Sequence, residues 1–121
     1  MAESIVFDKS KAFAIRIVRL YQWLTEEKHE FVLSKQCLRC GTSIGANLAE
    51  GLKGQSRLDF VAKLHISLKE AHETQYWLEL LKETDYISDQ MFSSLDDDCL
   101  ELIKLLTSII LTTKRNNENN S

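Results

Sequence analysis

The chain has 121 residues, of which 44% are hydrophobic and 27% charged, and its net charge is −3. This is the composition of an ordinary globular domain, with enough residues for one hydrophobic core but not for two. The longest apolar stretch, residues 105–111, is too short to span a bilayer, and the N-terminus lacks the basic and apolar regions of a signal peptide. We therefore expect one cytoplasmic domain over residues 1–121, with its three cysteines reduced.

Four segments carry apolar residues at three- and four-residue spacing, which predicts four amphipathic helices. Proline is absent, so no ring clash interrupts a long helix. The connections between the segments are short, which favours antiparallel neighbours and an all-α, up-and-down antiparallel four-helix bundle. The expected helices cover about residues 9–27, 31–52, 56–83 and 88–114, followed by a polar tail over 115–121.

Helix boundaries are marked by capping residues. Ser56, followed three residues later by Asp59, resembles a capping box at the start of the third helix. Ser88 is the expected N-cap of the fourth helix. Gly51 and Gly54 bracket the expected C-terminal end of the second helix.

The second and third helices each carry a line of residues beyond their core stripe. The line on the third helix is too apolar for a routine solvent face, and two carboxylates are interleaved with it. A helix with two apolar faces usually buries both, so this line predicts a contact between subunits; the alternative is that it packs inside the bundle. The candidate oligomer-interface residues are Arg39, Ile66, Glu70, Glu73, Trp77 and Leu80.

Small residues form a strip on the second helix at Gly41, Gly45 and Ala49. Each glycine inside a helix costs about 1 kcal/mol relative to alanine, so something must offset that cost. Close approach of another backbone is the simplest explanation. It could come from another subunit, or from the third or fourth helix of the same bundle.

Two short motifs resemble chemical sites without their context. Cys37 and Cys40 match C-x-x-C, but both lie on the apolar stripe of a helix interior, where cysteine behaves as a small hydrophobic residue. Glu26-x-x-His29 matches half of a di-iron motif, which needs a second copy and further glutamates. We therefore expect no catalytic residue, no metal site and no cofactor.

Charge is unevenly spread along the chain. Residues up to Lys69 carry a net charge of +4 and the remainder carries −7. This pattern fits two solvated faces of opposite sign, head-to-tail pairing of subunits, or a basic surface for a polyanion. The candidate nucleic-acid-binding residues are Arg16, Arg19, Lys35, Lys53, Arg57 and Lys63.

The string from Leu38 to Gly51, with Gly-Thr-Ser-Ile-Gly-Ala-Asn over residues 41–47, closely resembles the signature of a bacterial family. Its members are four-helix bundles first noticed as reading frames in intervening sequences of 23S ribosomal RNA genes. The agreement continues through Asp59-Phe60 and Tyr76-Trp77-Leu78, and covers roughly residues 11–113.

That family is similar to the accessory variability determinant protein of diversity-generating retroelements, a pentameric bundle that binds nucleic acid and a reverse transcriptase. The resemblance implies a homopentamer, and an adaptor for RNA, DNA or a reverse-transcriptase-like protein. The accessory protein is strongly basic, whereas this chain carries −3. The alternative is therefore a protein–protein interaction module with no role in nucleic-acid binding.

Overall fold

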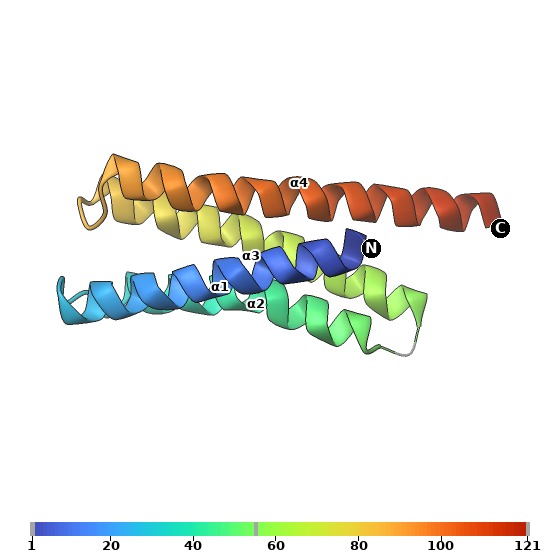
Figure 1. Cartoon of the computed structure of the whole chain (residues 1–121), viewed down its shortest axis with the longest axis horizontal. Helices are drawn as coiled ribbons and strands as arrows, with labels where there is room; N and C mark the ends of the chain where they lie inside the picture. The colour runs from blue at the N-terminus through green and yellow to red at the C-terminus, as the bar shows by residue number, and fades with distance from the viewer. Residues whose placement is uncertain (1, 55, 121) are drawn as a thin grey trace.

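The computed structural model describes residues 2–54 and 56–120, with residues 117–120 described by their backbone alone (Figure 1). Helices α1 and α3 each lie beside α2 and α4, and successive helices run in opposite directions. The predicted all-α, up-and-down antiparallel four-helix bundle is therefore confirmed. The helices are α1 (Ala2–Glu26), α2 (Leu33–Leu52), α3 (Arg57–Glu83) and α4 (Asp89–Asn120).

The core lies along the axis of the bundle, and every helix contributes to it once per turn. Leu24, Ile44, Leu78 and Leu106, one from each helix, are 0% exposed. Such a continuous apolar stripe stabilises each helix through tertiary packing more than through its intrinsic propensity. None of the helices, over the residues that the structure describes, combines the length and apolar character that a membrane crossing requires.

Two helices are longer than their sequence patterns predicted. Helix α1 begins at Ala2 and not near residue 9, because Val6 and Ser10 extend its buried stripe toward the N-terminus. Helix α4 continues to Asn120, past the expected end near residue 114, and Thr113 is still buried. No glycine or proline lies in this segment to end the helix. The last residue of the predicted tail, Ser121, lies outside the described residues.

Both predicted N-caps are present. The backbone N–H of Asp59 donates to Ser56 Oγ at 3.1 Å, and that of Met91 donates to Ser88 Oγ at 3.0 Å. The C-terminal end of α2 lies between Gly51 and Gly54, with Lys53 as the capping residue and Gly51 buried in the last turn of the helix. A Cβ on Gly51 would lie 3.0 Å from Cβ of Lys63, so this glycine permits close packing of α3.

The strip of Gly41 and Gly45 packs against α1, not against α3, α4 or another subunit. A Cβ added to Gly41 would lie 2.8 Å from Cγ1 of Ile17, and one on Gly45 would lie 3.0 Å from Oγ of Ser10. The prediction of a close approach was right, but its assignment to the third or fourth helix was wrong. Helix α2 packs against both α1 and α3. The sequence of α2 does not show which of these two helices the glycines face.

An unpredicted cap starts α2. The carboxylate of Glu30 accepts hydrogen bonds from the backbone N–H groups of Val32, Leu33 and Ser34, at 3.0, 2.9 and 2.6 Å. Burial alone would raise the pKa of Glu30 and is the largest single influence, but these backbone hydrogen bonds together outweigh it and lower the pKa. The ionised carboxylate thus accepts hydrogen bonds from N–H groups in the first turn of α2, which have no partner within the helix.

Replacing Glu30 with glutamine is expected to lower the free energy of unfolding at pH 7 by about 1 kcal/mol. Because the pKa of Glu30 is lowered in the folded chain, its contribution is present above the ordinary glutamate pKa and is lost as pH falls through the lowered value. The difference between variant and parent should therefore shrink at acidic pH. Urea unfolding at pH 7 and pH 3 measures this, with Glu27→Gln as an exposed control.

Candidate functional site

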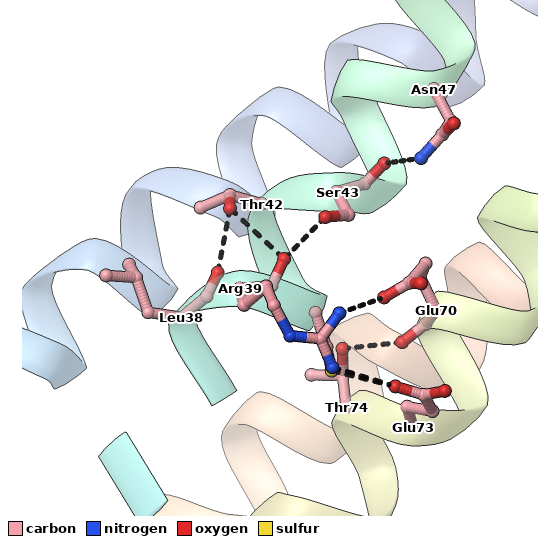
Figure 2. A network of polar contacts seen from close by, with 9 residues as sticks. Leu38, Arg39, Thr42, Ser43, Asn47, Glu70, Glu73 and Thr74 are labelled. Carbon is pink, nitrogen blue, oxygen red and sulfur yellow. Dashed lines mark hydrogen bonds and ion pairs between the residues drawn. The ribbon is translucent and has the colours of Figure 1, made fainter. Parts of the chain in front are cut away.

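A polar cluster joins the exposed sides of α2 and α3 (Figure 2). Arg39 of α2 reaches across to two carboxylates of α3, with Nη2 3.3 Å from Glu73 Oε2 and Nη1 3.7 Å from Glu70 Oε2. The buried thiol of Cys40 donates to the same Glu73 oxygen at 3.2 Å. Glu70 and Glu73 are three residues apart and so share one side of α3, which is why a single guanidinium meets both.

Glu70 is the unusual member of this cluster. Its side chain is only 13% exposed, and Oε2 is buried without a hydrogen-bond donor in the described part of the chain. The 3.7 Å separation from Arg39 gives attraction between charges but is too long for a hydrogen bond. A buried carboxylate oxygen without a donor costs free energy, so this atom has an unused capacity to bind a donor.

The hydroxyls of the signature string are engaged by their own helix. Thr42 Oγ1 donates to the carbonyl of Leu38 at 2.7 Å, and Ser43 Oγ donates to the carbonyl of Arg39 at 2.6 Å (Figure 2). Asn47 Nδ2 donates to the carbonyl of Ser43 at 2.8 Å. These bonds bind the side chains back to the backbone of α2, and leave Arg39 and Cys40 as the side chains of this string that contact α3 carboxylates.

The buried environment of the cysteines makes their thiols poor nucleophiles and poor metal ligands. Burial raises the pKa of the Cys37 thiol to about 12. Burial, followed by the hydrogen bond to Glu73, raises the pKa of Cys40 to about 12 as well. The thiolate is the nucleophile and the metal ligand, and at neutral pH it is essentially absent from both residues.

Three potential ligand atoms of Cys40, Glu70 and Glu73 lie within 4.8 Å of one another. The guanidinium of Arg39 already lies against both carboxylates, and its Nη2 is 3.4 Å from the Cys40 sulfur. A fixed cation thus occupies the place where a metal ion would bind, and the one sulfur ligand is protonated. The arrangement suits an ion pair that fixes the register of α2 against α3 better than it suits a metal centre.

Folded protein is expected to resist thiol-specific reagents at pH 7.5, because all three cysteines are buried. Full labelling should appear only in denaturant. The double replacement of Cys37 and Cys40 by alanine should lower the free energy of unfolding by about 1–2 kcal/mol, the range for small core truncations. Rapid labelling of a folded sample, or stoichiometric zinc in the purified protein, would contradict this.

The predicted interface line is only partly exposed. Ile66 is 39% exposed, whereas Trp77 and Leu80 are half-buried and Trp77 packs against the core. Tyr76, which we did not predict, is 57% exposed and meets the Trp77 ring edge-to-face at a centroid distance of 5.1 Å. Its outward place on α3 follows from helical spacing, but a tyrosine alone gives no signal of an interface.

The predicted basic residues do not form one surface. Arg16, Arg57 and Lys63 are engaged in ion pairs with Asp98, Glu3 and Glu50, at 2.7, 3.3 and 2.6 Å respectively. Arg19, Lys35 and Lys53 are exposed, but Lys35 and Lys53 lie at opposite ends of α2. Lys53 and Arg57 lie at the turn from α2 to α3 and Lys63 follows in α3, whereas Arg16 and Arg19 lie on one side of α1.

Sequence comparison places this bundle in a known group. Residues 2–108 match the family described as 23S rRNA-intervening sequence protein. The chain belongs to this family. The match covers the signature string of α2 and the α3 residues that pair with it, so the family resemblance found in the sequence is confirmed.

A solved structure with the same fold comes from the S23 ribosomal protein family of Bacteroides thetaiotaomicron. That protein, whose function is unknown, is 56% identical to this chain and superimposes with a TM-score of 0.89. The alignment covers 91% of this chain and 98% of the other. No curated protein sequence matches this chain.

Proposed function

We propose that this chain is a non-enzymatic helical scaffold whose copies associate as a homopentamer through the seam between α2 and α3. The observation that carries the proposal is the exposed apolar surface of Ile66 and Tyr76 on α3, beside the ion pairs of Arg39 with Glu70 and Glu73. The resemblance to a pentameric accessory protein supports the number of copies.

A second copy would improve this seam in two ways. It would remove the apolar side chains of Ile66 and Tyr76 from water, at about 25 cal/mol per Å² of buried area. It would also exclude water from the ion pairs of Arg39, which is 54% exposed in the single chain and therefore contributes little there. Polar groups of this kind fix the register of an interface more than they add to its affinity.

Site-specific photo-cross-linking tests whether the seam is the contact. Replacing Tyr76 with p-benzoylphenylalanine keeps an aromatic ring in place and should give covalent dimers on illumination. The same amino acid at Leu111 of α4, which is 56% exposed against 57% for Tyr76, should give monomers only. Equal cross-linking at the two positions, or none at either, would argue against this seam.

The second candidate function is weak, sequence-independent binding of RNA or DNA, or of a reverse-transcriptase-like protein that handles them. It is supported by the family description and by the presence of Lys53, Arg57 and Lys63 at and after the turn from α2 to α3. Two of these three side chains are already paired with carboxylates, so the affinity of one copy for nucleic acid would be low. Five copies acting together would raise that affinity by avidity.

Filter binding with single-stranded RNA tests the second candidate. Phosphate contacts release counterions, so binding should be detectable at low salt and fall steeply as salt rises. Lys53→Glu should weaken it in an oligomer, whereas Lys104→Glu on α4 should not. If no complex forms at about 50 mM salt and tens of micromolar protein, the chain does not bind RNA through phosphate contacts. A protein–protein scaffold with no role in nucleic-acid binding would then be better supported.

A further inference from the structure

A groove of about 610 Å³ lies between α1 and α4. Its floor is apolar, with Leu20 and Leu95 nearly buried and Trp23 and Met91 half-buried. Ile15, which is 52% exposed, forms part of its wall. The four-helix bundle therefore leaves an open apolar channel on the side where α1 faces α4.

The groove has the dimensions of a helix-binding channel. Its α1 lining extends from Ile15 to Trp23, eight steps of the helix or about 12 Å along the helix axis, which is roughly two helical turns. An amphipathic helix placed there would insert apolar side chains at positions i, i+3 or i+4 and i+7, the usual pattern of helix-in-groove recognition.

The two rims of the groove differ in charge. The α4 rim consists of the uncharged residues Gln90 and Ser94. The α1 rim carries Arg19, which lies within ion-pair distance of no carboxylate among the described residues, and Lys28 lies 5.3 Å above the Trp23 ring. Arg16 is also on this rim but is held by Asp98 at 2.7 Å. The charged residues that line the groove, Arg16 and Arg19, are therefore both cations of α1.

We propose that this groove binds an amphipathic helix of another protein, with glutamate or aspartate flanking its apolar stripe. The apolar floor would bury the stripe, and Arg19 and Lys28 would pair with the flanking carboxylates. The seam between α1 and α4 lies on the opposite side of the bundle from the seam between α2 and α3. The groove therefore does not overlap the surface of α2 and α3, and the proposal concerns the groove of each single copy.

Tryptophan fluorescence can test this directly, because the chain has two tryptophans and only Trp23 lines the groove. In a Trp77→Phe background, we would titrate a helical 14-residue peptide with leucines at i, i+3/i+4 and i+7 and flanking glutamates. The emission of Trp23 should change saturably, with a dissociation constant on the order of 10–100 µM. The same peptide with lysine in place of glutamate should bind at least tenfold more weakly.

Matched variants separate the two parts of the contact. Ile15→Glu should weaken peptide binding more than tenfold, whereas Val18→Glu, exposed on the same helix outside the groove, should leave it unchanged. Arg19→Glu should weaken binding about fivefold or more, and Lys11→Glu should not.

Three results would overturn the proposal. The first is no saturable change in emission up to about 1 mM peptide, or equal binding of the two peptides. The second is saturable binding of a single-stranded RNA oligonucleotide in place of the peptide, with the same loss on Arg19→Glu, which would assign the rim to nucleic acid. The third is a lower assembly mass for Ile15→Glu, which would assign the groove to a second copy of this chain. The seam between α2 and α3 is tested separately by cross-linking at Tyr76, so the two proposals can fail independently.

Discussion

Replacing Gly41 with alanine is expected to lower the free energy of unfolding by about 2 kcal/mol, although alanine is the better helix former. The new methyl group would lie 2.8 Å from Cγ1 and 2.9 Å from Cγ2 of Ile17. Ile17 is 1% exposed, and its Cβ would also lie 3.2 Å from the new methyl group, so the clash involves more than the end of a flexible side chain. Overpacking of about 3 kcal/mol therefore outweighs the gain in helix propensity of about 1 kcal/mol.

A double-mutant cycle with Ile17→Ala isolates this contact. Alanine at position 17 removes both of the atoms that lie within 3.0 Å of the new methyl group. The cost of Gly41→Ala should then fall by more than half, since the two sites are in direct contact. Chemical denaturation of the four proteins measures the effect. A Gly41→Ala variant more stable than the parent would show that α1 and α2 do not approach as closely as described.

Replacing Ile66 with glutamate is expected to convert the proposed assembly into single chains without loss of helix. Ile66 is 39% exposed in the single chain, so its own fold tolerates a charge there, whereas an apolar interface does not. The new carboxylate would also lie on the same side of α3 as Glu70 and Glu73, and so add like charge to the seam. Sedimentation velocity and far-ultraviolet circular dichroism, measured on the same sample, separate dissociation from unfolding.

Leu100→Glu is the matched control for this variant. Leu100 is 37% exposed and lies on α4, away from the seam between α2 and α3, so its replacement should leave the assembly mass unchanged. Trp77→Glu is a poorer probe than the sequence alone suggests. Trp77 packs against the core, and a charge there would also destabilise the single chain. An Ile66→Glu variant with the parent's mass would place the contact elsewhere.

Much of the fold follows from the spacing of apolar residues. The four helices and the caps at Ser56 and Ser88 were predictable because each rests on residues that are close in sequence. The cap at Glu30 was not predicted, because a glutamate reaches the N–H groups of residues 32–34 only when the loop bends back toward them. The extra turns of α1 were missed because a single valine, Val6, carries the stripe beyond Ser10.

The candidate site could be predicted only in part. Helical spacing placed Glu70 and Glu73 on one side of α3, and the structure adds that Arg39 pairs with both inside a single chain. The sequence could not show that Gly41 faces α1, because helical periodicity gives the direction of a side chain but not the neighbour it meets. The basic surface was overestimated because counting charges along the chain ignores pairs made between helices, such as Arg16 with Asp98.

The mass of the unmodified chain in solution tests the scaffold proposal most directly. Sedimentation equilibrium at micromolar concentration should give the mass of five chains of 13.9 kDa each, with no change on moderate dilution. A mass of two or more chains other than five would be compatible with the proposed contact through α2 and α3, but would change the symmetry of the assembly. A mass of one chain at every concentration up to hundreds of micromolar would contradict the account, and would leave Ile66 and Tyr76 exposed to water.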